Sequence, residues 1–392
     1  MSFTGTFMQQ AALLWHVSLL VEPGRRGLAL GLVGLVRVVP IVLFSIVAGV
    51  AADVFDRRRL MLLTQLGGAL VAAALSTLAF LGLSAVWPIY ALAALSASAG
   101  AFDPPARQSL VPMLVPRADL PNAINLNTAM VQAASVAGPA IGGIVIALGS
   151  VGWAYAVNAL SFLFVVFALV LMRDVPPTDR STHHARDSMS IAAARDGLRF
   201  VFGSPMIRST MLVDFFATFF ASAMALLPIF AQDILHVGAR CYGLLAAAPA
   251  VGALLGSAGM LVVSHRLRRQ GQTLVWAVMA YGLTTVVFGF SRAFWLTFAC
   301  LALAGAADAV SMVIRNLVRQ LETPDAMRGR MIGVNMIFFM GGPQLGELEA
   351  GLVAQAFGAP FSVVTGGIGC LIATAAIAKA TPELWQYKKS QT

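Results

Sequence analysis

Residues 49–60 read GVAADVFDRRRL and separate two long hydrophobic segments of the chain. The first segment ends at Asp53. Asp56 and three arginines, Arg57 to Arg59, then precede a new uncharged run that begins at Leu60. Two hydrophobic helices joined by a short arginine-rich turn are typical of a chain that re-enters a membrane from its cytoplasmic side. The same arrangement recurs along the chain.

The composition is that of an integral membrane protein. Of the 392 residues, 59% are hydrophobic and only 11% are charged, whereas a soluble domain carries about 25% charged residues. Segments 60–102 and 120–172 contain no Asp, Glu, Lys or Arg. Because a spanning helix needs about 20 residues, each of these runs holds two helices and a turn. The three cysteines have no metal-ligand spacing and no disulfide pattern.

Hydrophobic segments of spanning length predict an all-α protein with twelve transmembrane helices. The expected spans are 2–21, 28–52, 60–82, 87–108, 121–147, 152–172, 207–234, 241–264, 272–291, 294–316, 329–355 and 358–379.

The basic residues define the orientation. The net charge is +9, but 21 of the 26 Lys and Arg residues fall in turns on one side of the predicted spans, including Arg315 and Arg319. The positive-inside rule makes that side cytoplasmic. Both termini are therefore expected in the cytoplasm, with the chain crossing a bacterial inner membrane several times. The charges mark topology, so we expect no nucleic-acid partner.

One long polar segment, 173–206, divides the spans six and six. We expect domains at 1–172 and 207–392, joined by this cytoplasmic linker. Ile191, Leu198 and Val201 share one helical face opposite Arg195 and Arg199, which predicts an amphipathic helix. Such a helix could lie along the membrane, lie beneath the bundle, or simply connect the halves.

The two halves show internal similarity. Asp308 follows Asp103 by 205 positions, and GPQLGE at 342–347 follows GPAIGG at 138–143 by 204. Pro249 likewise follows Pro40 by 209 positions. Weak similarity at a steady offset is typical of a duplicated transporter with its site between the halves.

The loop Gly49, Asp53 and Arg57 to Arg59 resembles the loop motif of the major facilitator superfamily, although Val54 stands where that family usually has Arg. GPxxGG in span five resembles the motif of its drug:proton antiporters. Segments 104–127 and 321–334 resemble the transmembrane secretion effector branch, which includes enterobactin exporters and macrolide efflux proteins. The resemblance implies the major facilitator fold of two pseudo-symmetric six-helix halves. It also implies a shortened start before span one.

The resemblance implies a gate and a cavity. Asp53 would face the start of span eleven and Arg57 would reach Asp103, although a transport role for Asp103 is the alternative. Gly138, Pro139, Gly142 and Gly143 would either bend span five to seal the cavity or serve packing. The resembling proteins line their cavity with spans one, four, seven and ten. The gating candidates are Gly49, Asp53, Arg57, Arg58 and Asp103, and the cavity-lining candidates are Gln9, Gln10, His16, Ser98, Thr218, Ser222 and Ser311.

Charges inside spans are candidates for proton coupling, because one charge at the bilayer centre costs at least about 2.5–3.5 kcal/mol. Asp214 either carries a proton or forms a salt bridge to a neighbouring helix. Asp308 is expected to pair with Arg266 or Arg315. Glu347 is a further proton site or faces outside water, and Arg37 either binds an anion, pairs with a buried acid or reaches a headgroup.

These features predict an alternating-access exporter of a hydrophobic or amphipathic small molecule, of the drug or siderophore class, driven by protons. The chain has no GxxxxGK[ST] loop for ATP and no recognisable nucleophile and base, so an enzyme is not expected. We expect no cofactor and no metal, and a monomer in the lipid bilayer. The alternatives are an importer or facilitator, and a membrane sensor or scaffold that does not transport.

Overall fold

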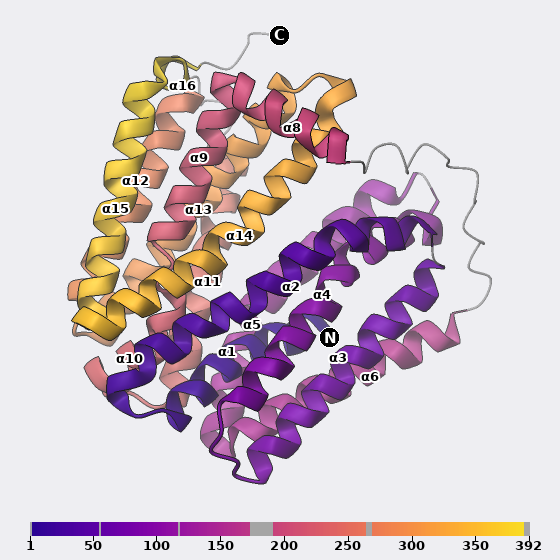
Figure 1. Ribbon diagram of the computed structural model, residues 1–392, viewed down its shortest axis with the longest axis vertical. Coiled ribbons are helices and arrows are strands. Elements are labelled where there is room, and N and C mark those ends of the chain that lie inside the picture. Colours follow the sequence, from indigo (N-terminus) through magenta and orange to yellow (C-terminus); the bar gives the residue numbers. More distant parts are fainter. Residues whose placement is uncertain (1, 55, 117, 173–190, 264–268, 388–392) are drawn as a thin grey trace. The chain divides into compact units, whose positions relative to one another are not determined.

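The computed structural model describes residues 2–54, 56–116, 118–172, 191–263 and 269–387. Long α-helices follow one another through all of these ranges (Figure 1). The long helices are α1 (Ser2–Leu20), α2 (Arg26–Val54), α3 (Arg57–Phe80), α4 (Trp87–Leu114), α5 (Leu120–Leu148), α6 (Val151–Leu171), α9 (Pro205–Phe220), α11 (Ala239–Val263), α12 (Gln270–Phe290), α13 (Phe294–Glu322), α14 (Asp325–Phe357) and α15 (Ala359–Ala380). The prediction of an all-α membrane protein is confirmed.

Short elements complete the chain. Helix α9 continues through η2 (Ala223–Leu226), α10 (Leu227–Ile229) and η3 (Phe230–Ile234), while η1 (Pro23–Arg25) precedes α2. Helix α8 (Ile191–Gly203) occupies the stretch predicted to be amphipathic, and α16 (Pro382–Gln386) follows α15. Pro228 occupies an early position of α10. A backbone N–H at such a position has no acceptor within the helix, so proline is tolerated there.

Nine helical segments among the described residues are long and apolar enough to cross a membrane. The other three long helices are α1, α4 and α14. They carry more polar side chains, such as Gln9 in α1, Asp103 in α4 and Glu347 in α14. Together the twelve correspond one to one with the predicted spans.

The chain divides into two compact units. Unit 1 consists of the described residues of Met1–Pro23, Leu35–Met189 and Val237–Ala247, and unit 2 of those of Gly24–Gly34, Ser190–His236 and Ala248–Thr392. The beginning of α2 therefore packs with unit 2, and the beginning of α11 packs with unit 1.

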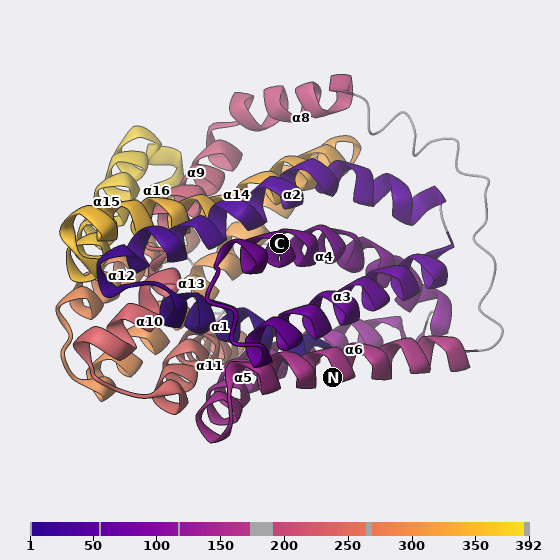
Figure 2. The same ribbon diagram turned by 60° about the horizontal axis from the view of Figure 1, so that its bottom comes forward.

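The packing inside unit 1 is repeated inside unit 2. In unit 1, α1 packs against α5 and α6, and α3 packs against α4 and α6. In unit 2, α9 packs against α14 and α15, and α12 packs against α13 and α15. Figures 1 and 2 show each unit as a bundle of long helices. Helices at equivalent places in the two units therefore pack in the same way, in agreement with the internal similarity of the sequence.

Helix bounds differ from the predicted spans mainly at charged ends. The predicted span 294–316 extends to Glu322 in α13, and the predicted span 329–355 begins at Asp325 in α14. Hydrophobicity alone stops a predicted span at the first cluster of charges, whereas a helix continues as long as its backbone bonds and side-chain partners allow.

Candidate functional site

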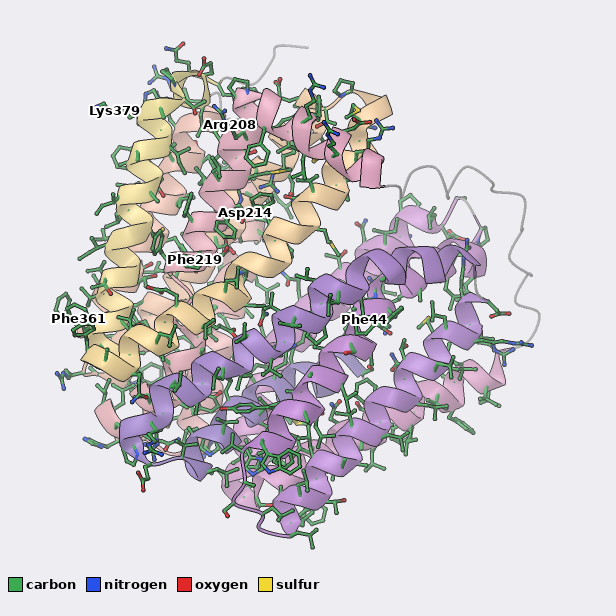
Figure 3. All side chains as sticks on the ribbon, viewed as in Figure 1. Phe44, Arg208, Asp214, Phe219, Phe361 and Lys379 are labelled. Carbon is green, nitrogen blue, oxygen red and sulfur yellow. The ribbon has the colours of Figure 1, made fainter. Side chains whose placement is uncertain are left out.

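Three charged side chains meet in the interior of unit 2. Asp214 lies on α9, and Arg315 and Arg319 lie on α13. Arg315 Nη1 forms an ion pair with Asp214 Oδ1 at 2.7 Å, and Arg319 Nη2 donates a hydrogen bond to Asp214 Oδ2 at 3.0 Å. All three side chains are at most 4% exposed. Figure 3 shows Asp214 part-way along α9, between Arg208 and Phe219.

A fourth charge, Asp308, extends this group toward solvent. Arg315 Nη2 donates to Asp308 Oδ1 at 3.2 Å, and the Asp308 side chain is 41% exposed. Arg315 therefore bridges one buried carboxylate and one accessible carboxylate. We call Asp214, Asp308, Arg315 and Arg319 the charge cluster.

The sequence of α13 explains why three of these residues face the same way. Positions 308, 315 and 319 fall within an arc of about 40° on a helix with 3.6 residues per turn. Ser311 lies on the same stripe and is fully buried. A second helix that supplies one carboxylate opposite this stripe completes the cluster, and α9 does so with Asp214.

Arg319 is held on several sides. Besides Asp214, it donates to the side-chain oxygen of Asn335 on α14 and to the backbone oxygen of Thr210 on α9 at 3.2 Å. Thr323 donates to the backbone oxygen of Arg319. These contacts make Arg319 a fixed tie between α9, α13 and α14.

Two guanidinium groups and two carboxylates give the charge cluster no net charge. Removing one partner of a buried ion pair costs about 3–5 kcal/mol, because the remaining charge is left uncompensated. Within the described part of the chain, Ser311 Oγ and Arg315 Nε have no hydrogen-bond partner. The cluster thus combines strong internal pairing with buried polar atoms that have further hydrogen-bonding capacity.

The predicted pairing of Asp308 with Arg315 is present, while Arg266 lies outside the described residues. For Asp214 the salt-bridge alternative is the arrangement observed. The assignment of Arg315 and Arg319 to a cytoplasmic turn is wrong, because both lie within α13 and are buried. Their spacing from Asp308 on one helical stripe is the sequence signal that could have revealed them.

The other polar residues predicted to line a cavity are mostly satisfied within their unit. Gln9 Oε1 accepts from Asn158 at 2.7 Å, and His16 Nδ1 lies 3.3 Å from the Tyr155 hydroxyl. Both residues are buried against α6 because α1 packs on that helix, and a cavity-lining position for them stays a prediction. Gln10 is exposed.

Three predicted hydroxyl groups bond to backbone oxygens. Ser98 donates to Ala94, Thr218 donates to Asp214, and Ser222 donates to Pro343. Thr218 therefore lies one helical turn from the charge cluster, and Ser222 ties the end of α9 to α14.

Asp103 belongs to a polar network in unit 1. It accepts from Arg107 at 2.9 Å and from Gln65 at 2.7 Å, and Gln65 in turn accepts from Ser2. The Arg107 guanidinium also lies 4.4 Å from the centre of the Phe3 ring. The observed contacts of Asp103 thus connect α4 with α3 and with the start of α1.

The gating loop is described only in part. Gly49 and Asp53 lie within α2, but the surroundings of the Asp53 side chain fall outside what the structure describes. Arg58 donates to the backbone oxygens of Leu169 and Val170 at the end of α6, at 2.8 and 3.0 Å. Arg58 therefore caps α6, and the latch between Arg57 and Asp103 stays a prediction.

Glycines of the GPxxGG motif allow close helix contacts in unit 1. A Cβ atom on Gly138 would lie 2.7 Å from the Thr4 backbone oxygen, and one on Gly143 would lie 2.8 Å from Gly243 Cα. The motif therefore packs α5 against α1 and against the start of α11. Whether Pro139 also bends α5 to seal a cavity stays a prediction.

Arg37 and Glu347 are the remaining coupling candidates. Arg37 is half-buried on α2 and forms no ion pair with a residue that the structure describes. Glu347 lies on α14 beside α2, where a Cβ on Gly34 would lie 2.8 Å from its side chain. No group of three His, Cys, Asp or Glu residues in the described ranges is arranged to hold a metal ion.

Known proteins resemble this chain over nearly its full length. A family model described as transmembrane secretion effector matches residues 1–391. The multidrug efflux pump Tap of Mycolicibacterium fortuitum is 30% identical over 87% of this chain and 84% of its own length. The enterobactin exporter EntS of Escherichia coli is 26% identical over 88% of this chain and 81% of its own length.

Solved structures show the same fold. One is a bacterial homolog of the human lysosomal transporter Spinster in an inward-facing, unoccupied conformation. Its match covers 100% of this chain and 97% of its own, with a TM-score of 0.75 at 16% identity. A D-xylose–proton symporter covers 99% of this chain and 98% of its own, with a TM-score of 0.71 at 14% identity.

Proposed function

The chain belongs to the transmembrane secretion effector family of major facilitator transporters, and from this premise we propose that it exports a hydrophobic or amphipathic small molecule by proton antiport. The efflux pump and the siderophore exporter among its relatives support the direction and the substrate class. It is a multi-pass membrane protein, and we place both termini in the cytoplasm of a bacterial inner membrane, as the basic turns favour.

One observation carries the proton coupling. Arg315 lies between Asp214, which is almost fully buried, and Asp308, whose side chain is 41% exposed. Because the Asp308 side chain has exposed surface and the Asp214 side chain has almost none, we assign proton exchange to Asp308. Asp214 accepts a hydrogen bond from Arg319 and forms an ion pair with Arg315, so it is the fixed counter-charge of both arginines.

Protonation of Asp308 would change the charge of the cluster. The cluster is neutral when both carboxylates are ionised, and it becomes positive by one unit when Asp308 takes up a proton. An uncompensated positive charge inside a membrane is unfavourable. Arg315 then needs a new acceptor or a different helix arrangement, and either response links proton uptake to a conformational step.

The cycle follows from this linkage. A proton that enters from outside neutralises Asp308 and frees one side of Arg315. The conformational change exposes Asp308 to the cytoplasm, where the proton leaves and Arg315 pairs again with Asp308. The proton gradient drives export of substrate in the opposite direction, because protonation favours one conformational change and deprotonation favours its reverse. No covalent chemistry is involved.

Reconstituted transport tests this proposal. The purified protein is placed in proteoliposomes with an imposed pH gradient, and a panel of amphipathic drugs and catecholate siderophores is assayed. We expect at least one compound to move against the proton flow, at a rate that falls when the gradient is collapsed. Downhill movement that ignores the gradient would identify a facilitator, and absence of both substrate and proton flux would favour a sensor or scaffold.

A further inference from the structure

Helix α8 has one face packed against the rest of unit 2. Val201 is 1% exposed and packs with Met331 and Val334 of α14. A Cβ on Gly197 would lie 3.1 Å from the Arg330 backbone oxygen, and the Arg330 guanidinium pairs with Asp196 at 3.5 Å. This face therefore fixes α8 to the beginning of α14.

The opposite face of α8 is exposed and carries both apolar and basic side chains. Leu198 and Phe202 are 41% and 45% exposed, and Arg195 and Arg199 are exposed beside them. These four positions fall within an arc of about 100° on the helix, so Leu198 lies beside Arg195 and Arg199 and not opposite them as predicted. Phe202 borders the packed face, since its ring centroid lies 6.4 Å from that of Phe338 on α14. Neither arginine forms an ion pair with a described residue. An apolar strip bordered by arginines is typical of a helix that lies in a membrane interface.

The position of α8 places this face at the level of lipid headgroups. Figure 1 shows α8 and α16 at the same end of unit 2. At that end, exposed Trp276 on α12 and Trp385 on α16 meet edge to face with ring centroids 6.3 Å apart. Figure 3 places Arg208 and Lys379 at this end and Phe361 at the other. Tryptophan and basic residues gather where a protein crosses the membrane–water boundary.

We propose that the exposed face of α8 binds anionic phospholipid. Arg195 and Arg199 contact the headgroup phosphate and its negative charge, while Leu198 and Phe202 enter the acyl boundary. Charge complementarity decides for an anionic lipid over a zwitterionic one. Because the other face holds Gly197 and Val201 against α14, bound lipid restrains that end of α14. This site does not depend on the transported substrate or on Asp308.

Lipid-specific fluorescence quenching tests the site in the full-length protein. A bimane label is placed on Leu198→Cys in a Cys241→Ser background, since Cys300 and Cys370 are buried. The protein is incorporated in nanodiscs that contain doxyl-labelled phosphatidylglycerol or doxyl-labelled phosphatidylcholine at equal mole fraction. Two arginines near an anionic surface predict quenching by phosphatidylglycerol that is roughly threefold stronger or more.

Two double variants separate the site from a general charge effect. Arg195→Gln/Arg199→Gln should bring the quenching ratio to about one, while both lipids still quench because the apolar strip is intact. Arg25→Gln/Arg292→Gln removes the same charge from exposed positions at the other end of unit 2 and should leave the ratio unchanged.

Other results would overturn the proposal. Equal quenching by the two lipids in the unmodified helix would rule out selectivity for anionic headgroups. No quenching by either lipid would show that this face does not meet the bilayer, and a protein partner would then be its occupant. Transport need not be measured for any of these outcomes, so they are independent of the proposed function.

Discussion

The Arg315 guanidinium lies 2.7 Å from the Asp214 carboxylate, and neither side chain is more than 4% exposed. An ion pair this deeply buried inside a spanning bundle joins α9 to α13 and stabilises each charge only as long as the other is present. Asp308 is paired with the same arginine but has a side chain that is 41% exposed, and it is the group to which we assign the response to protons.

Arg315→Gln should destabilise the protein strongly. The substitution leaves Asp214 with Arg319 alone and leaves Asp308 without its guanidinium partner. Loss of one member of a buried pair predicts a fall in the free energy of unfolding of about 3–5 kcal/mol. Denaturant titration in mixed micelles measures it.

A second substitution distinguishes charge imbalance from lost packing. Asp214→Asn/Arg315→Gln keeps the charge cluster neutral and should recover part of the lost stability. Arg292→Gln, at an exposed position, is the control. If Arg315→Gln unfolds at the same denaturant concentration as the unmodified protein, the buried pair is not a stabilising element.

Asn335→Ala should have a smaller effect than Arg315→Gln. Asn335 accepts one of the hydrogen bonds that fix Arg319, and a hydrogen bond to a charged group contributes about 1.5–3 kcal/mol. The same titration measures the loss, with exposed Asn122→Ala as the control. Equal stability of the two variants would mean that Arg319 does not need its contact with α14.

Gly243→Ala tests the contact between α5 and α11 in unit 1. A Cβ at this position would lie 2.5 Å from the Pro139 backbone oxygen and 2.7 Å from Gly143 Cα. The backbones must move apart to admit it, so we expect poor folding and a loss of roughly 1–3 kcal/mol.

Gly259→Ala is the matched control on the same helix, because a Cβ there meets no atom within 4 Å. It should be neutral or slightly stabilising, since alanine favours a helix over glycine by about 1 kcal/mol. Similar behaviour of the two variants in thermal unfolding would contradict the close contact between α5 and α11.

Much of the fold could be predicted from the sequence because membrane burial leaves a strong signal. Uncharged runs such as 120–172 can only be spanning helices, and the common offset of Asp103 and Asp308 reveals the duplication. The bilayer dictates helix length, so these inferences need no knowledge of which helices touch.

The site was harder to predict because it depends on contacts between helices far apart in sequence. Hydrophobicity ended the tenth span before Arg319 and assigned both buried arginines to a turn. Nothing in α9 alone shows that Asp214 faces α13. For Gln9 and His16, polarity inside a span predicted a cavity, but polarity alone does not reveal their partners Asn158 and Tyr155 on α6.

The central claim is that Asp308 carries the coupled proton. Its most direct test compares Asp308→Asn with the unmodified protein in proteoliposomes, using a transported compound found in the substrate panel. Exposed Asp119→Asn is the matched control. Asparagine keeps an oxygen beside Arg315 but cannot exchange a proton.

Proton influx during export and the rate of substrate exchange without a gradient are both measured. We predict that Asp308→Asn retains exchange but loses proton influx and its response to pH. Normal proton-driven export by Asp308→Asn would contradict the account.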